Sequence, residues 1–459
     1  MMKIKSYIYS WIALLAVTLT LGGCGNLYTG DETPITDDNG GGDDGGGGSG
    51  VDDSYDEPMP VMVAFNAPNY TALTRGQGAL IPSESGYQEK LQKAIFYVYA
   101  FRADIPREGK VYSVLCKDDK ETCLIDGTTG TQGADAALCN HGRQATYTSA
   151  TSFGQWVDDA NQPMYSLLSP VTPYDFFVYY IDDLQNDAQS SSYKTLQPGS
   201  YCGFARNDTG IRFDVAVDGT QDLICAKAKL TDDQVKNIDA MPEEEKDNIK
   251  KYYYSTYTAR RNITPVFSLR HQLAYVSFKL KAAKSESIKD SEQTLTVNSI
   301  AIESIYRGTF CVAARDNSLL GATFHEDGGR SDLFLKKEGN DPKLNWLIKE
   351  GEYTVPQMSN SYLLVPPSND AVLKVNASVY IQTQEGADHV DKPYNLTYPL
   401  KDLFKNTDEN SSYGFLPGWK YTVNITFYGI ERIGVEVQVD GWQNGGSIDI
   451  DQEDINFPR

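Results

Sequence analysis

Apolar and aromatic residues recur at every second position through most of this chain, and that spacing is typical of β-strands. Successive side chains of a strand point to opposite faces of a sheet, so a period of two separates two kinds of face. In residues 275–282, Val276, Phe278 and Leu280 fall on one face, whereas Ser277, Lys279 and Lys281 fall on the other. Strand spacing also occurs in residues 60–68, 295–305, 373–381, 421–427 and 433–439, and residues 95–101 and 175–181 are apolar or aromatic on both faces. The chain is therefore predicted to be mainly β.

Helical signals are confined to one region. Thr231 and Gln234 have the spacing of a capping box, in which each side chain accepts a hydrogen bond from the backbone N–H of the other residue at the start of a helix. Pro242 precedes a run of acids that ends in lysines, which is the charge order that favours a helix with Pro at its first position. Two short helices are expected near 231–255.

The first residues are typical of a targeting signal. Lys3 and Lys5 precede an apolar run at 7–21, and the sequence Leu-Gly-Gly-Cys at 21–24 matches a bacterial lipobox. Such a motif predicts that residues 1–23 are removed and that Cys24 carries acyl chains, which hold the protein at the outer membrane. The alternative is a plain secretory signal with an incidental cysteine. Either interpretation places the rest of the chain outside the cytoplasm.

Residues 24–57 are predicted to be an acidic tether. Between Asp31 and Glu57 there are ten acids and no Lys or Arg, with many glycines and almost no large apolar side chains. A segment of this composition cannot bury enough surface to order itself. The twelve-residue calcium loop is absent, so a solvated spacer is the favoured interpretation. The net charge of -21 also makes nucleic acid a poor partner.

Six cysteines follow Cys24 in a compartment where disulfides persist. Fifteen pairings are possible and the sequence does not choose among them; free, buried thiols are the alternative. Cys139 and His141 lack a second pair with ligand spacing, so no metal is expected. The cysteines that could form disulfides are Cys116, Cys123, Cys139, Cys202, Cys225 and Cys311.

No catalytic constellation is evident. The four histidines form no metalloprotease motif, and the nucleophile-elbow, P-loop and dinucleotide motifs are absent. Residues 191–194 match Ser-x-x-Lys without its companion motifs, and His271 is expected to be a packed core residue. Carboxylate pairs for glycoside hydrolysis stay open, because a sequence does not show which carboxylates are neighbours in space. The prediction is a protein that is not an enzyme and has no cofactor.

Several motifs occur in an order that resembles the fimbrillin family, the type V pilus subunits of Gram-negative gut and oral anaerobes. The resemblance spans roughly residues 58 to 450 and rests on the shared order of weak motifs. These motifs are TALTRGQG (71–78), FYVYAF (96–101), YDFFVYYI (174–181), DLICA (222–226), FSLRHQLAYVSFKL (267–280), TVPQ (354–357), FLPGWKYTVNITF (415–427) and VDGWQNGG (439–446).

The resemblance implies two β-sandwich domains with transthyretin-like character, expected at 58–262 and 263–459. It also implies assembly by donor-strand exchange. A first strand within residues 58–75 would fill a groove, and an Arg-specific surface protease would cut between Arg75 and Gly76. The C-terminal strand of another subunit would then replace it. The expelled residues would be Val61, Val63 and Phe65, and the donor residues Val435, Val437, Val439, Ile448 and Ile450.

The function implied is a structural subunit of a surface pilus that supports adhesion and has other pilus subunits, of its own or another kind, as partners. In the alternative, Arg75 is only a loop cation, and the chain is an uncut anchored lipoprotein of the same fold. It would then act as a pilus anchor or as a surface protein that binds a ligand or glycan, and its 30 tyrosines would suit a glycan.

Overall fold

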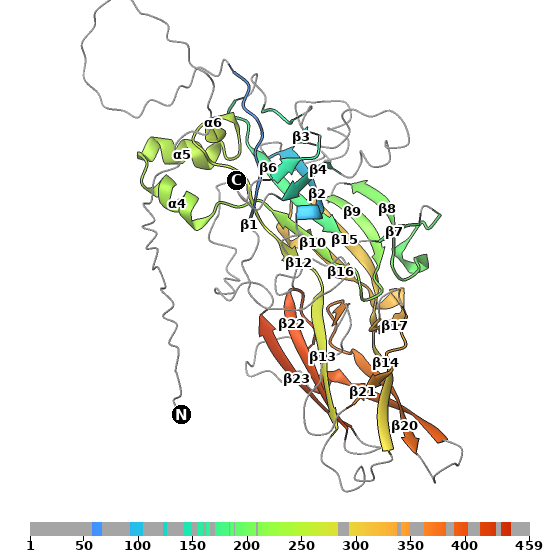
Figure 1. Ribbon diagram of the computed structural model, residues 1–459. Helices are drawn as coiled ribbons and strands as arrows, with labels where there is room; N and C mark the ends of the chain where they lie inside the picture. The colour runs from blue at the N-terminus through green and yellow to red at the C-terminus, as the bar shows by residue number, and fades with distance from the viewer. Residues whose placement is uncertain are drawn as a thin grey trace, which may run out of the picture. The chain divides into compact units, whose positions relative to one another are not determined.

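The computed structural model describes sixteen stretches of the chain, all within the unit Val51–Arg459 (Figure 1). Strands make up most of the regular structure, so the predicted mainly-β sandwich fold is confirmed. The described residues are 57–66, 92–103, 123–125, 142–147, 154–158, 162–165, 170–182, 184–187, 189–207, 210–282, 293–336, 341–348, 362–381, 390–402, 414–427 and 433–441.

The first sheet is built around two strands that are apolar on both faces, β2 and β6. Phe96 and Val98 are buried on one face of β2, and Tyr99 and Phe101 are buried as well. Both faces must therefore be covered. The strand order is β12 (Arg270–His271), β10 (Leu223–Lys227), β6 (Tyr174–Ile181), β2 (Ile95–Arg102), β4 (Arg143–Tyr147) and β5 (Gly154–Trp156), and β3 (Cys123–Ile125) also pairs with β2.

A second sheet packs against one face of the first. Tyr179 of β6 lies 5.5 Å from Phe213 and 6.4 Å from Phe310, measured between ring centroids, so aromatic side chains fill the space between the sheets. The strand order of this sheet is β16 (Gly321–Phe324), β15 (Arg307–Ala314), β9 (Gly210–Ala216), β8 (Ser200–Asn207) and β7 (Gln185–Asn186).

Two further sheets contain most of the later strands. One has the order β19 (Tyr362–Val365), β13 (Ala274–Ala282), β22 (Trp419–Phe427) and β23 (Ile433–Gly441). The other has the order β17 (Arg330–Phe334), β14 (Gln293–Ile305), β20 (Val372–Ile381) and β21 (Val390–Pro399), with β18 (Trp346–Leu347) also on β14. The boundary predicted between residues 262 and 263 stays a prediction. Strand β15 follows this boundary in the sequence, yet it pairs with β9, which precedes the boundary.

The long polar stretches 117–165 and 317–350 are indicated by composition as surface loops, and that prediction is wrong in part. Strands β3, β4 and β5 lie in the first stretch, and β16, β17 and β18 lie in the second. Among the described residues there are also short 3-10 helices: Tyr193–Thr195, Asn317–Leu319, Glu326–Gly328 and Leu400–Asp402.

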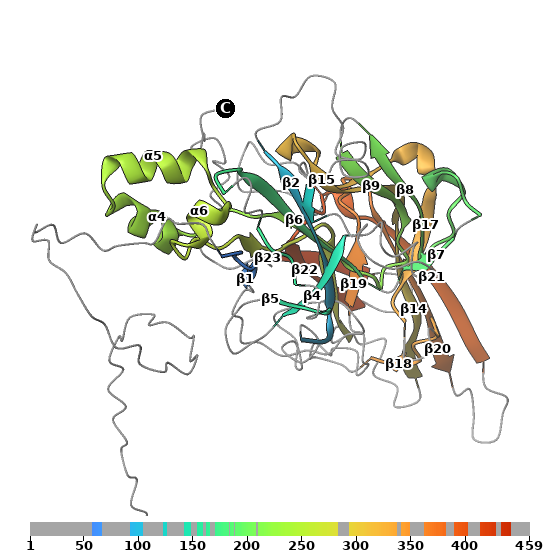
Figure 2. The same cartoon turned by 90° about the horizontal axis from the view of Figure 1, so that it is seen from above.

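Three helices follow β10: α4 (Asp232–Asp239), α5 (Glu243–Lys251) and α6 (Thr256–Ala259). The two helices predicted near 231–255 are confirmed, and the capping box of Thr231 and Gln234 is formed. Pro242 is the residue before α5 and not its first residue, and α6 was not predicted. Both views show the helices on one side of the short strand β1 (Ala64–Asn66), with the first sheet on its other side (Figures 1 and 2).

Candidate functional site

The candidate site is the place where the first described segment of the chain is buried among residues far along the sequence. Val61 and Val63 are 0% exposed and Phe65 is 1% exposed, whereas Met62 between them is 38% exposed. The period of two predicted by the sequence therefore sorts this segment into a buried and an outer face. The buried face covers the side of the first sheet that the second sheet leaves open.

The first described segment lies in a groove, and aromatic side chains form the bottom of this groove. The ring of Phe65 lies 4.9 Å from that of Phe96 in β2 and 6.5 Å from that of Tyr147 in β4. On its other side the ring of Phe267 in β11 (Val266–Ser268) lies 5.7 Å away. A Cβ at Gly154 would lie 2.6 Å from the Phe65 ring and 2.9 Å from Val63, so only glycine fits there.

Hydrogen bonds hold the segment along both of its edges. On one edge Val61 N donates to Pro163 O at 2.8 Å, and Gly154 N donates to Val63 O at 2.8 Å. The indole Nε1 of Trp156 also donates to Val61 O, at 3.0 Å. The other edge pairs with β11 in parallel, so that Ala64, Phe65 and Asn66 are opposite Val266, Phe267 and Ser268.

This segment is therefore an inserted strand whose partners all lie later in the chain. Burying two valines and a phenylalanine stabilises the folded state by about 5–9 kcal/mol, at about 1.5–3 kcal/mol for each side chain. Each backbone hydrogen bond adds about 0.5–1.5 kcal/mol. These contributions approach the net stability of a whole domain, about 5–15 kcal/mol. Without the strand, the first sheet would expose an apolar groove with unpaired backbone groups on either side.

The predicted donor residues are only partly within the described residues. Val435, Val437 and Val439 lie in β23, where they are opposite Ile425, Val423 and Tyr421 of β22. In the described sheet β23 has a neighbour on one side only, and such an edge can accept another strand. Ile448 and Ile450 lie outside the described residues, as do Cys24, Arg75 and Gly76.

Three of the described cysteines, Cys202, Cys225 and Cys311, carry free thiols. Cys202 and Cys225 are buried and Cys311 is half-buried. Burial raises the pKa of the Cys225 thiol well above its usual value and that of Cys311 to about 11, so neither is a reactive thiolate near neutral pH. Cys123 lies in β3, and Cys116 and Cys139 lie outside the described residues. Any pairing among these three stays a prediction.

His271 is a packed residue, as the sequence indicated, and its partner was not predicted. Its Nδ1 lies 2.8 Å from Oδ2 of Asp222, and both side chains are buried. The pair ties β12 to the residue that precedes β10. Lys194 of the Ser-x-x-Lys match forms an exposed ion pair with Asp327, with 2.6 Å between Nζ and Oδ2.

Within the described part of the chain, no group of three or more His, Cys, Asp or Glu side chains could hold a metal ion. None of the helices described there is long and apolar enough to cross a membrane. The groove partners Gly154 and Trp156 were missed at the sequence level, because they lie in a polar stretch without clear periodicity.

No protein-family model matches the sequence, and no curated protein matches it either. Solved structures do resemble the fold. One is a candidate cell adhesion protein from Bacteroides uniformis, with 14% identity, a TM-score of 0.41, and coverage of 84% of this chain and 99% of the other. A fimbrial protein from Bacteroides vulgatus has 13% identity and a TM-score of 0.40, with coverage of 84% and 99%.

A third similar structure is the fimbrial anchor protein Mfa2 from Porphyromonas gingivalis, with 11% identity, a TM-score of 0.27, and coverage of 84% of this chain and 98% of the other. At these identities and scores the three matches report similarity and assign neither a family nor a function to this chain.

Proposed function

We propose that this chain is a structural subunit of a bacterial surface pilus, without enzymatic activity, that polymerises by donor-strand exchange and supports adhesion. It is made as an outer-membrane lipoprotein precursor with acyl chains on Cys24. An Arg-specific surface protease cuts it after Arg75, and its partners are other pilus subunits.

The burial of the first strand carries this proposal. Val61, Val63 and Phe65 fill an aromatic groove formed by residues that follow them by some 30 to 200 positions, and Arg75 lies only ten positions after Phe65. A cut after Arg75 would leave the strand bound by contacts alone. Its departure would then gain the freedom of a separate peptide, and another strand could take its place.

The donor in this proposal is the segment after β23. All nine residues of β23 are already paired with β22, and withdrawing them would break that ladder. Ile448 and Ile450 alternate with acids in the segment 447–451, which gives them the spacing of Val63 and Phe65. Replacing a buried Val and Phe by two Ile side chains keeps the apolar character of the groove.

The test is the state of the protein in filaments sheared from the cells that make it. We expect the filament protein to begin at Gly76 by N-terminal sequencing, and an Arg75→Ala variant to accumulate at full mature length and form no filaments. Arg107→Ala is the matched control, because it removes an arginine outside the predicted site. Filaments composed of protein that still carries Cys24 would refute the proposal.

The long acidic spacer favours a second candidate function. A spacer of this length suits a subunit that stays anchored, and such a lipoprotein would remain uncut and seat a pilus or bind a surface ligand. In that case Cys24→Ala should release the protein from the membrane and abolish its attachment to filaments. Normal incorporation of the Cys24→Ala variant into filaments would exclude this candidate.

A further inference from the structure

Three basic residues lie across β11 from the first strand. Lys229 follows β10 and forms an isolated antiparallel bridge with Val266 of β11, which in turn pairs with Ala64 of β1. The pairing of Cys225 with Arg270 has the same register. Adjacent residues across strands therefore form rows, and one row contains Ala64, Val266 and Lys229.

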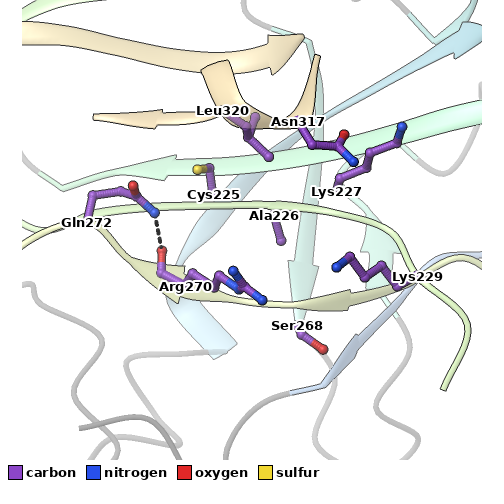
Figure 3. A pocket seen from close by; sticks show the side chains of 9 residues that line it. All are labelled: Cys225, Ala226, Lys227, Lys229, Ser268, Arg270, Gln272, Asn317 and Leu320. Atoms are coloured by element: carbon purple, nitrogen blue, oxygen red, sulfur yellow. Dashed lines mark hydrogen bonds between the residues drawn. The ribbon is translucent and has the colours of Figure 1, made fainter. Parts of the chain in front are cut away.

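Rows of this kind share a face of the sheet, because side chains directly opposite each other point the same way. Phe65 and Phe267 lie on the buried face. Lys227 and Lys229 alternate with buried alanines and lie on the opposite face, as Arg270 does. We call Lys227, Lys229 and Arg270 the basic strip. Figure 3 shows the side chains of Lys229 and Arg270 extending toward each other in a shallow pocket.

The positive charge of the strip is incompletely balanced. Lys227 forms an ion pair with Asp175 at 2.9 Å. No carboxylate of the described residues lies within ion-pair distance of the Lys229 ammonium. Loss of hydration lowers the pKa of Lys229, and the charges of Arg270 and Lys227 lower it further. The first strand, which we call the resident strand because it fills the groove before any exchange, offers no acid, since residues 60–66 carry no charged side chain.

The C-terminal segment has the charge that the resident strand lacks. If Ile448 and Ile450 take the buried positions of Val63 and Phe65, the alternation places Asp449 and Asp451 on the other face, whichever way the segment runs. Lys229 lies on the same face. Its backbone is two strands away across the sheet, which is roughly 10 Å from the backbone of the strand in the groove. A lysine side chain is long enough to extend over the intervening strand.

We propose that the basic strip recognises the acidic face of residues 447–451 of a second copy of this chain and so favours the incoming strand over the resident one. The proposal rests on the proposed function, because it assumes that the C-terminal segment enters the groove. It assigns Lys229, with Arg270, the role of a specificity determinant for strand exchange.

The experiment uses protein cut after Arg75 with an Arg-specific protease and kept at nanomolar concentration, where polymerisation through its own C-terminal segment is slow. A fluorescent peptide of residues 444–459 is titrated by anisotropy. We expect Lys229→Gln and Arg270→Gln each to weaken binding about two- to five-fold, which is the effect of one partly exposed ion pair. Lys250→Gln, on the exposed side of α5, is the matched control and should have no effect.

A peptide with Asp449→Asn and Asp451→Asn should bind the wild type more weakly than the unmodified peptide does, by a similar factor. On the Lys229→Gln, Arg270→Gln double variant, the two peptides should bind equally. The difference between the two peptides should disappear at 0.5 M salt, where the screening length is only about 4 Å. Equal melting temperatures of the uncut variants check that each one folds.

Equal binding of both peptides to the wild type and to every variant would overturn the role of the strip and leave strand exchange standing. If the unmodified peptide fails to bind the cut wild type at all, the C-terminal segment is not the donor. That result overturns both this inference and the exchange step of the proposed function.

Discussion

Replacing Gly154 by alanine should loosen the first strand without any proteolysis. The added Cβ would lie 2.6 Å from the Phe65 ring and 2.9 Å from Val63, which is closer than side chains pack, so the strand must shift. Overpacking of this kind costs about 1–3 kcal/mol, or a rise of about five- to 150-fold in the population with the strand released. The strand stays seated in most molecules, because its buried side chains contribute about 5–9 kcal/mol.

Hydrogen–deuterium exchange at the amides of Val61 and Ala64 measures this release, since both N–H groups donate to backbone oxygens outside the strand. We expect their exchange to accelerate in Gly154→Ala by the same factor. Met62→Ala is the control: its side chain is 38% exposed, so it should change exchange little.

A double-mutant cycle identifies the cause. Leucine at position 65 removes the ring atoms that the new Cβ would meet, so Gly154→Ala should cost about 1 kcal/mol less in a Phe65→Leu background. If Gly154→Ala leaves exchange unchanged, or costs the same in both backgrounds, the strand is not held in the groove as described.

Trp156→Phe removes the hydrogen bond to Val61 O and should lower the free energy of unfolding of the uncut protein by about 0.5–1.5 kcal/mol in urea titrations. Thr231→Ala removes the cap of α4 and should cost about 1 kcal/mol by the same measurement. Burial opposes the ionisation of Asp218, but Lys336 at 2.7 Å and the hydrogen bonds from Thr220 together outweigh it and lower the pKa of Asp218. A carboxyl whose pKa is lower in the folded state than in the unfolded state stabilises the fold only above its unfolded pKa. Lys336→Met should therefore reduce the stability at pH 7, and the difference between variant and wild type should shrink below about pH 4.

The sequence predicted the fold class because the signal for it is local. Alternation in residues 275–282 depends only on neighbours along the chain, and it predicted the alternating burial in β13. The same holds for Val61, Val63 and Phe65. The apolar residues on both faces of β2 are explained by the structure: the second sheet covers one face and the first strand, with the helices, covers the other.

The groove itself could not be predicted in the same way, because its edges come from distant pairings. Strand β1 pairs with β11 about 200 residues later, and Gly154 lies in a polar stretch whose strands have only three to five residues. The basic strip has the same origin. Lys227 and Lys229 alternate on one segment, and Arg270 joins them only through the register between β10 and β12.

The strength of the first strand's hold has a consequence for how exchange could proceed. A strand stabilised by about 5–9 kcal/mol of apolar burial, with hydrogen bonds in addition, would leave an empty groove too rarely for assembly to wait on it. In the proposed exchange, the incoming segment would therefore bind while the resident strand is still partly seated. Lys229 lies across β11 from the C-terminal end of the resident strand, the end that a cut after Arg75 would free, and it carries a charge that this strand does not match. An acidic segment attracted there would be held next to the groove as the resident strand frays. Each of its residues that enters the groove would then replace contacts that the resident strand loses there.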